Sequence, residues 1–240
     1  MKKTGRALPA ALDSQMRTLD QLFRYSVVIF LMVFMLGAAL IIGVFSVNVG
    51  CRIARGWNII ALKIFGVEVE NQFEGSPSAL DAGGVIIGLT QQSLIDPTAG
   101  YAAWNRRVMS IWNIEYALIP FFGWVMGLLN MIHIDRSAKE SSAISVTNQG
   151  KARLKAGKWI ILFPEGTRTP VGSHKPYRKG GARLAGLTQA TVLPVAHNAG
   201  HFWPRNSFLK YPGLITVSIG HAIPSYGKSG DQLHTEVESW

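Results

Sequence analysis

The stretch WIILFPEGTRT, residues 159–169, joins an apolar run to a polar turn. Its first part, residues 159–163, is apolar throughout, which is typical of a short strand buried on both faces. Pro164 and Gly166 favour a tight turn directly after that strand. The turn carries an acid, a hydroxyl and a guanidinium: Glu165, Thr167 and Arg168. A guanidinium can bind phosphate through two parallel hydrogen bonds, so the stretch predicts a buried strand ending at a phosphate-binding turn. A structural ion pair within the turn is the alternative.

Other apolar runs of strand length surround this stretch, at residues 67–72, 84–89, 131–135, 191–197 and 215–223. Helical patterns lie between some of them. One is expected to begin with a capping box from Ser137 to Glu140 and to end at Gly157; another covers residues 179–189. Strands that alternate with helices predict an α/β fold with a mostly parallel central sheet flanked by helices.

Polar or special residues follow three of these runs. In parallel sheets, ligands bind beyond the carboxyl ends of the strands, which is where these residues stand. Residues 91–96 follow the run at 84–89, and Asp135 with Arg136 ends the run at 131–135. The segment VLPV, residues 192–195, lies within a later run. We expect these clusters to converge on the turn at residues 163–169.

The N-terminal part contains residues 25–47, which carry no charge and are long enough for a membrane helix of about 20 residues. A buried helix of a soluble protein is the alternative. Residues 51–67 form an amphipathic pattern with Trp57 and resemble an interfacial helix. Basic residues flank the apolar run on both sides, so a hairpin dipping into one leaflet is favoured over a clean span.

These patterns divide the chain into a polar basic segment at 1–24, membrane-anchoring helices at 25–66 and an α/β domain at 67–240. The last residues read as a helix that continues beyond Trp240, so we expect the C-terminus to be truncated. A further apolar stretch, residues 117–129, is open to three interpretations: the lining of an apolar channel, an element that dips into the leaflet, or ordinary core packing.

The composition limits the classes of partner that the protein is expected to bind. A formal net charge of +10 favours an anionic partner: nucleic acid, acidic lipid or a phosphorylated substrate. Nucleic acid is disfavoured, because the basic residues flank the FPEGTR segment instead of lining one helix face. Cys51 is the only cysteine, which excludes an intrachain disulfide, and its place beside the apolar run makes it a poor nucleophile. No ligand cluster with metal-site spacing is present in the sequence.

Together the motifs resemble those of the glycerolipid acyltransferase family, in particular its bacterial 1-acyl-sn-glycerol-3-phosphate (lysophosphatidic acid) acyltransferases. Three of four family blocks match, as IDR at 134–136, FPEGTR at 163–168 and VLPV at 192–195. The first family block is His-x4-Asp or Glu. This chain has Gln91 at the histidine position, while Gln92, Ser93 and Asp96 agree with the block.

The resemblance implies a mechanism. In the family the histidine deprotonates the acceptor hydroxyl, which attacks an acyl thioester, and the acid orients the histidine. The catalytic positions would be Gln91 and Asp96. The acceptor phosphate would be held by Arg136, Glu165, Gly166, Thr167 and Arg168. The acceptor or acyl pocket would include Ser93, Pro194 and Val195.

The same resemblance implies the partners and the location. The acceptor would be lysophosphatidic acid and the product phosphatidic acid. The donor would be acyl-CoA or acyl-carrier protein, with no bound cofactor or metal. The protein would sit in the membrane bilayer of a bacterium, at the inner membrane, with its catalytic domain on the cytoplasmic face.

Gln91 departs from the family pattern, because an amide cannot accept a proton near neutral pH. Losing a general base typically costs about 10²–10⁴-fold in rate. Three explanations stay open: an introduced substitution, a natural non-catalytic relative, or another base among His133, His174, His197 and His201. Two alternative functions also stay open: acylation of another lysolipid acceptor, and lipid binding without catalysis.

Overall fold

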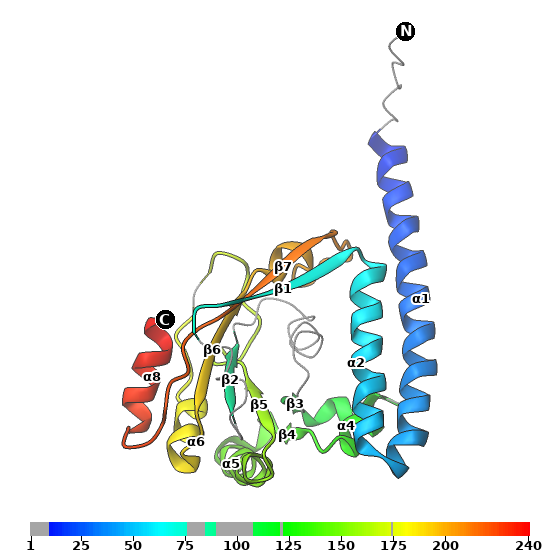
Figure 1. Cartoon of the computed structure of the whole chain (residues 1–240). Helices are drawn as coiled ribbons and strands as arrows, with labels where there is room; N and C mark the ends of the chain where they lie inside the picture. Colours follow the sequence, from blue (N-terminus) through cyan, green and yellow to red (C-terminus); the bar gives the residue numbers. More distant parts are fainter. Residues whose placement is uncertain (1–9, 76–84, 90–107, 121, 174) are drawn as a thin grey trace.

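The computed structural model describes residues 10–75, 85–89, 108–120, 122–173 and 175–240. In this part of the chain the apolar runs pair into one sheet (Figure 1) with the order β1-β7-β6-β2-β5-β3-β4. The strands are β1 (Val67–Phe73), β2 (Ile86–Leu89), β3 (Val108–Asn113), β4 (Ile132–Ile134), β5 (Trp159–Leu162), β6 (Val192–His197) and β7 (Gly213–Ile219). Every pairing is parallel except that of β6 with β7, which confirms the predicted mostly parallel sheet.

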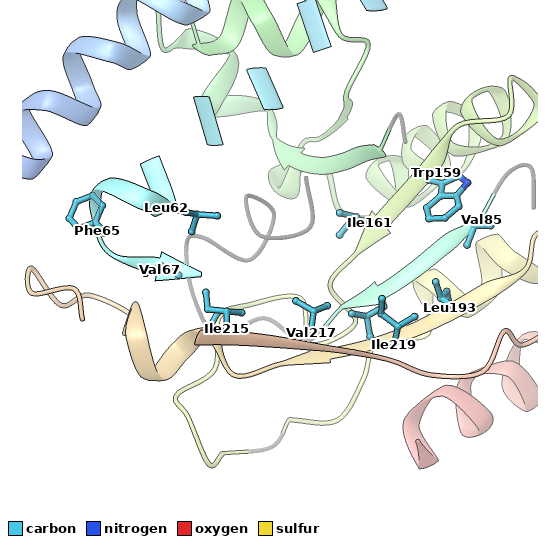
Figure 2. Packing of buried hydrophobic residues seen from close by; sticks show 12 residues of the cluster. Leu62, Phe65, Val67, Val85, Trp159, Ile161, Leu193, Ile215, Val217 and Ile219 are labelled. Carbon is cyan, nitrogen blue, oxygen red and sulfur yellow. The ribbon is translucent and has the colours of Figure 1, made fainter. Parts of the chain in front are cut away.

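The sheet is covered on both faces, which explains the unbroken apolar run of β5. Ile160 packs toward helices α5 (Lys139–Lys155), α6 (Gly180–Thr188) and α8 (Gly230–Ser239), in a cluster that includes Leu154, Leu184 and Leu233. Its neighbour Ile161 packs on the opposite face, in the cluster shown in Figure 2. Successive side chains of a strand point to opposite faces, so both must be apolar when both faces are covered.

Strand β3 is absent from the sequence-based prediction. Its sequence, VMSIWN, lacks both the clear alternation and the β-branched run that mark the other strands. Met109 and Ser110 are both buried although their side chains point to opposite faces, because β3 lies between β5 and β4. Position inside the sheet therefore outweighs the weak local signal.

The predicted start of α5 is wrong in its detail and the predicted end is right. The N-cap of α5 is Ala138 instead of Ser137, and no side chain caps it. The Asp135 carboxylate accepts hydrogen bonds from the Ser137 backbone N–H (2.9 Å) and hydroxyl (2.6 Å), so a short 3-10 helix, η3 (Arg136–Ala138), precedes α5. The nearer carboxylate thus replaces the expected cap. At the other end Gly157 has φ +68°, as expected of a glycine that terminates a helix.

The N-terminal helices form a hairpin beside the sheet (Figure 1). Helix α1 (Ala10–Phe45) and helix α2 (Val47–Ile64) are separated by Ser46 alone. Near this turn the helices approach closely, since a Cβ on Gly50 would lie 3.2 Å from the Gly43 Cα. Among the described helices, α1 is the one long and apolar enough to cross a membrane, over Ser14–Phe45. It begins earlier than residue 25, where the apolar run starts.

A joint of polar and aromatic contacts fastens the hairpin to the α/β domain. Gln21 of α1 is buried, and its side chain bonds both the N–H and the C=O of Lys210, at 3.2 Å each. Within the hairpin, the Arg24 guanidinium donates to the carbonyl of Ile64, the last residue of α2, at 2.5 Å. Tyr25 packs against Phe65 and Phe208. We call residues 21 and 25 with their partners outside the hairpin the joint. Helix α1 projects beyond it toward the N-terminus (Figure 1).

Candidate active site

The motif-bearing strands β6, β2 and β5 are neighbours in the sheet. Gly88 of β2 is paired with Pro194 of β6 on one side and with Leu162 of β5 on the other. All three strands run parallel, so their carboxyl ends open at the same edge. Adjacent strands lie about 4.8 Å apart, so Pro194 and the FPEGTR segment flank the strand that leads toward Gln91. Gln91, Ser93 and Asp96 themselves lie outside the described residues.

Arg136 follows the edge strand β4, separated from β2 by β5 and β3. Strand β3 pairs with β5 at Ser110 and with β4 at Asn113. Three residues of strand span about 10 Å, which brings the end of β4 level with the start of the FPEGTR turn. The backbone of Arg136 therefore lies near the same edge of the sheet as the FPEGTR turn, and β4, which it follows, is three strands away from β2.

The FPEGTR segment forms the predicted tight turn. The Gly166 N–H donates to the Phe163 carbonyl at 2.9 Å, and Gly166 has φ +66°. A Cβ at this glycine would lie 2.6 Å from the Arg178 Nε, so a larger residue is excluded by strain and by contact. The Arg178 N–H in turn donates to the Pro164 carbonyl at 2.7 Å. The turn is thus closed by the downstream loop, which brings the Arg178 guanidinium beside Gly166.

Glu165 is the acid of the turn and is buried. Its carboxylate accepts a hydrogen bond from the Thr169 hydroxyl, and Thr169 is buried as well. Tyr177 lies close to this acid. Burial raises the pKa of the Tyr177 phenol, and the negative charges of Glu165 and Glu238 raise that pKa further. The Tyr177 N–H also donates to Glu238 Oε1 at 3.0 Å, which ties this loop to α8. Glu165 therefore has contacts that would hold the turn in one shape.

Thr167 and Arg168 are half-buried on this turn. Arg205 Nη1 donates to the Arg168 carbonyl at 2.7 Å, so a third arginine lies at the turn. Arg205 also lines an open hollow beside it, with Pro170, Val171, Gly200, His201, Pro204 and Asn206. Sequence reasoning missed Arg205, because 37 residues separate it from Arg168 and no motif marks it. The turn is suited to an anionic group.

Pro194 and Val195 lie in the middle of β6 and are buried. Val195 belongs to the cluster that contains Trp159 and Ile161 (Figure 2). Pro194 accepts a backbone hydrogen bond from Gly220 at 3.0 Å through its carbonyl. Lacking an N–H, a proline is unusual inside a sheet, and here it stands directly beside Gly88.

The histidines considered as substitute bases occupy different places. His197 is buried at the end of β6, and its Nδ1 accepts the Ala199 N–H at 3.2 Å. His133 lies in β4, where its backbone bonds the Gln149 side chain. His201 is exposed in α7 (Ala199–Phe202) beside the hollow, and His174 lies outside the described residues. In the described part of the chain, no three His, Cys, Asp or Glu residues gather as a metal site would require.

Comparison with known proteins adds a family and a fold. Residues 68–198, more than half of the chain, match the family model named Acyltransferase. A segment of 129 residues is 43% identical to a 1-acyl-sn-glycerol-3-phosphate acyltransferase of Pseudomonas aeruginosa, covering 52% of this chain and 50% of that protein. A protein of the same name from Cocos nucifera is 34% identical over 134 residues, covering 55% of this chain and 44% of that protein. The chain spans about half the length of these relatives.

The fold also matches a solved structure. The crystal structure of the 1-acyl-sn-glycerophosphate (LPA) acyltransferase from Thermotoga maritima superimposes with a TM-score of 0.78 and covers 94% of this chain and 93% of that one. The two sequences are 22% identical, so this likeness supports the fold alone. It extends over almost the whole chain and agrees with the predicted fold class.

Proposed function

Because the chain belongs to the acyltransferase family, we propose that it is built to transfer a fatty acyl chain to the 2-hydroxyl of 1-acyl-sn-glycerol-3-phosphate. The supporting observation is the neighbouring arrangement of β6, β2 and β5, which open at one edge with FPEGTR beside the strand that leads to Gln91. The relatives named as acyltransferases for this acceptor share 43% and 34% identity with about half of the chain.

The reaction needs two substrates at this edge. The acceptor oxygen would attack the thioester carbonyl of acyl-CoA or acyl-carrier protein, forming the ester C–O bond and breaking the C–S bond. The leaving thiolate would take up the proton that the hydroxyl gives away. Arg168 and Arg136 would bind the acceptor phosphate, with Glu165, Gly166 and Thr167 holding the turn that presents Arg168. A guanidinium suits this role because it stays charged and donates two parallel hydrogen bonds.

We further propose that Gln91 impairs this chain as a catalyst. In the family's first block, the histidine takes the proton of the acceptor hydroxyl. A glutamine there could accept or donate a hydrogen bond but could not carry the proton, so binding would survive while turnover falls. Asp96 would then contact an amide instead of an imidazolium. Ser93, Pro194 and Val195 would border the acceptor or acyl site.

The hairpin of α1 and α2 is proposed as the membrane anchor. Helix α2 returns along α1 and the domain lies beside both (Figure 1), which suits insertion into one leaflet better than a clean span. A bacterial inner membrane, with the domain on the cytoplasmic face, would place the site where soluble acyl donors are available. The +10 charge would favour its anionic lipids.

The test is thiol release from an acyl-CoA in the presence of lysophosphatidic acid, with this chain and its Gln91→His variant in the same detergent. We expect the variant to be about 10²–10⁴-fold faster. A Gln92→His variant is the matched control and should stay slow. Equal rates for this chain and Gln91→His would refute the role of position 91. No turnover by either, together with binding of lysophosphatidic acid, would favour the lipid-binding alternative, and turnover with another lysolipid would change the acceptor.

A further inference from the structure

The segment between β3 and β4 forms a small apolar lobe beside the hairpin. It consists of the 3-10 helix η2 (Ile114–Leu118) and helix α4 (Phe122–Leu128), and we call residues 114–120 and 122–128 the apolar lobe. Its one charged residue is Glu115, next to the end of β3, where its carboxylate accepts a hydrogen bond from the Asn113 side chain at 3.0 Å; from there to Asp135 the sequence contains no Asp, Glu, Lys or Arg. In composition the lobe therefore resembles the apolar part of α1, although it is part of the α/β domain.

One face of the lobe is fastened to the apolar half of α1. Val125 and Met126 of α4 share a buried cluster with Leu36 of α1, and Val47 and Cys51 of α2 pack at its margin. Leu128 reaches Gly43, since a Cβ there would lie 2.4 Å from the Leu128 Cδ2. The lobe thus contacts α1 well inside its uncharged run.

The opposite face of the lobe is exposed and apolar. Leu118 is 84% exposed and Trp124 57% exposed, and three more large side chains on this surface are exposed: Ile114, Tyr116 and Ile119. Side chains lining an internal acyl channel would point inward, so this exposure disfavours the channel interpretation. Five large apolar side chains exposed within residues 114–124 are typical of a binding surface.

The position of the lobe along α1 indicates which medium covers the exposed face of the lobe. A helix rises about 1.5 Å per residue, so Leu36 and Gly43 lie about 16 and 27 Å from Tyr25 along α1. The exposed apolar side chains of α1 continue along the same length: Ile29, Phe30, Val33, Phe34, Ile41, Val44 and Phe45. The apolar lobe packs beside residues 36–43 of α1. If those residues lie in a bilayer, the lobe must lie at the same depth.

We propose that the apolar lobe inserts into the acyl-chain region of the bilayer as a third membrane element, contributed by the α/β domain itself. The proposal rests on the membrane anchoring by α1 and α2 proposed above. Because β4 and Arg136 follow α4 directly, insertion of the lobe also sets the height of that edge of the sheet above the lipid. The domain is then held at two places, the joint and the lobe, so it cannot rotate freely on its anchor.

The test uses the full chain with Cys51→Ala and one environment-sensitive fluorophore on an introduced cysteine. Leu118→Cys reports on the lobe. Phe45→Cys, at the hairpin turn and 87% exposed, reports on the anchor, and Tyr226→Cys, 85% exposed in the loop before α8, is the aqueous control. These similar exposures mean that labelling disturbs packing little at any site. The vesicles contain phosphatidylethanolamine and phosphatidylglycerol, with and without lipids that carry a nitroxide quencher in the acyl chain.

We expect vesicles to shift the emission to the blue at positions 118 and 45, and the nitroxide lipids to quench both several-fold more than position 226. Quenching at 45 with position 118 behaving like 226 would overturn the lobe proposal alone. No quenching at 45 would remove the anchoring proposal on which it rests. A blue shift at 118 without quenching would mean that protein, such as a second copy, covers the lobe, and would also overturn the proposal.

Discussion

Phe34 in α1 and Ile161 in β5 are both large apolar residues, yet the first is 72% exposed and the second fully buried. Strand β5 is covered on both faces by the same chain, by α5, α6 and α8 on one face and by a cluster from β1, β6, β7 and α2 on the other. Helix α1 has cover on one side only, from α2 and α4. Apolar surface left in water is costly, so the uncovered side of α1 indicates a medium outside the chain.

The contacts that join the hairpin to the α/β domain also differ from those that hold the domain itself together. The sheet and its helices are held by continuous apolar packing, and Leu62 and Phe65 at the end of α2 extend that packing to the hairpin. The joint adds directed contacts, in which Gln21 and Tyr25 meet a few backbone groups and rings. Such contacts are specific in direction but few in number. Changes in the sheet, the site and the joint should therefore have separate and distinguishable effects.

The largest effect is expected from a matched pair of truncations. Ile161→Ala should lower the free energy of unfolding by about 2–5 kcal/mol, because it leaves a cavity in a core that cannot collapse around it. Phe34→Ala should change it by less than about 0.5 kcal/mol in detergent, because detergent and not protein covers that side chain. Denaturant unfolding followed by circular dichroism measures both. A comparable loss for Phe34→Ala would mean that α1 is covered by protein.

A second substitution separates the site from the anchor. Arg168→Gln should weaken binding of lysophosphatidic acid by about tenfold to a hundredfold, since a hydrogen bond to a charged group contributes about 1.5–3 kcal/mol. Binding of a monoacylglycerol, which lacks the phosphate, should not change. Calorimetry in detergent measures both ligands, with Lys155→Gln on the exposed end of α5 as the control. An equal loss for both ligands would argue against phosphate binding at Arg168.

The joint is tested by Gln21→Leu, which keeps the volume but removes both hydrogen bonds to Lys210. Leaving these backbone groups unpaired in a buried place should cost about 1–3 kcal/mol of unfolding free energy. Gln15→Leu, on the exposed part of α1, is the matched control and should be nearly neutral. If the two variants lose equally little, the contacts of Gln21 do not hold the hairpin to the domain.

The smallest effect concerns pH. Lys210 is buried over the Trp203 ring, 5.0 Å from its centre, and burial lowers the pKa of its ammonium to about 8. The unfolded chain then binds more protons at this lysine than the folded chain at pH values above 8, so stability should rise with pH from 8 toward 9.5. Lys210→Met should show a flatter profile over this window. Thermal unfolding across the pH series is the measurement, and parallel profiles would contradict the lowered pKa.

Much of this architecture could be predicted from local sequence. The uncharged run after Tyr25 predicted the long helix, the run at 159–163 predicted β5, and Pro164 with Gly166 predicted the turn that follows. These features depend on burial and backbone geometry within a few residues, which local sequence controls. Ser137 shows the limit of that reasoning, because a competing carboxylate two residues away took the place of the expected cap.

Other features could not be found in this way. The residues of β3 gained their strand conformation from neighbours on both sides, and Arg205 reached the Arg168 carbonyl from 37 residues away. The roles of Gln91, Ser93 and Asp96 stay predictions, supported by their place after β2 and by the family to which the chain belongs. Residues 117–129 had three interpretations from sequence, and the proposal that they enter the leaflet is supported by their packing against α1 and by their exposed side chains.

The sequence by itself determined which segments are apolar, where the chain turns and which residue types stand at the proposed site, because these depend on neighbours within a few positions. The tertiary structure alone decided which apolar surfaces the chain covers and which it leaves exposed. Burial is a property of the assembled layers: Ile161 and Phe34 differ little in hydrophobicity and differ entirely in what the fold places around them.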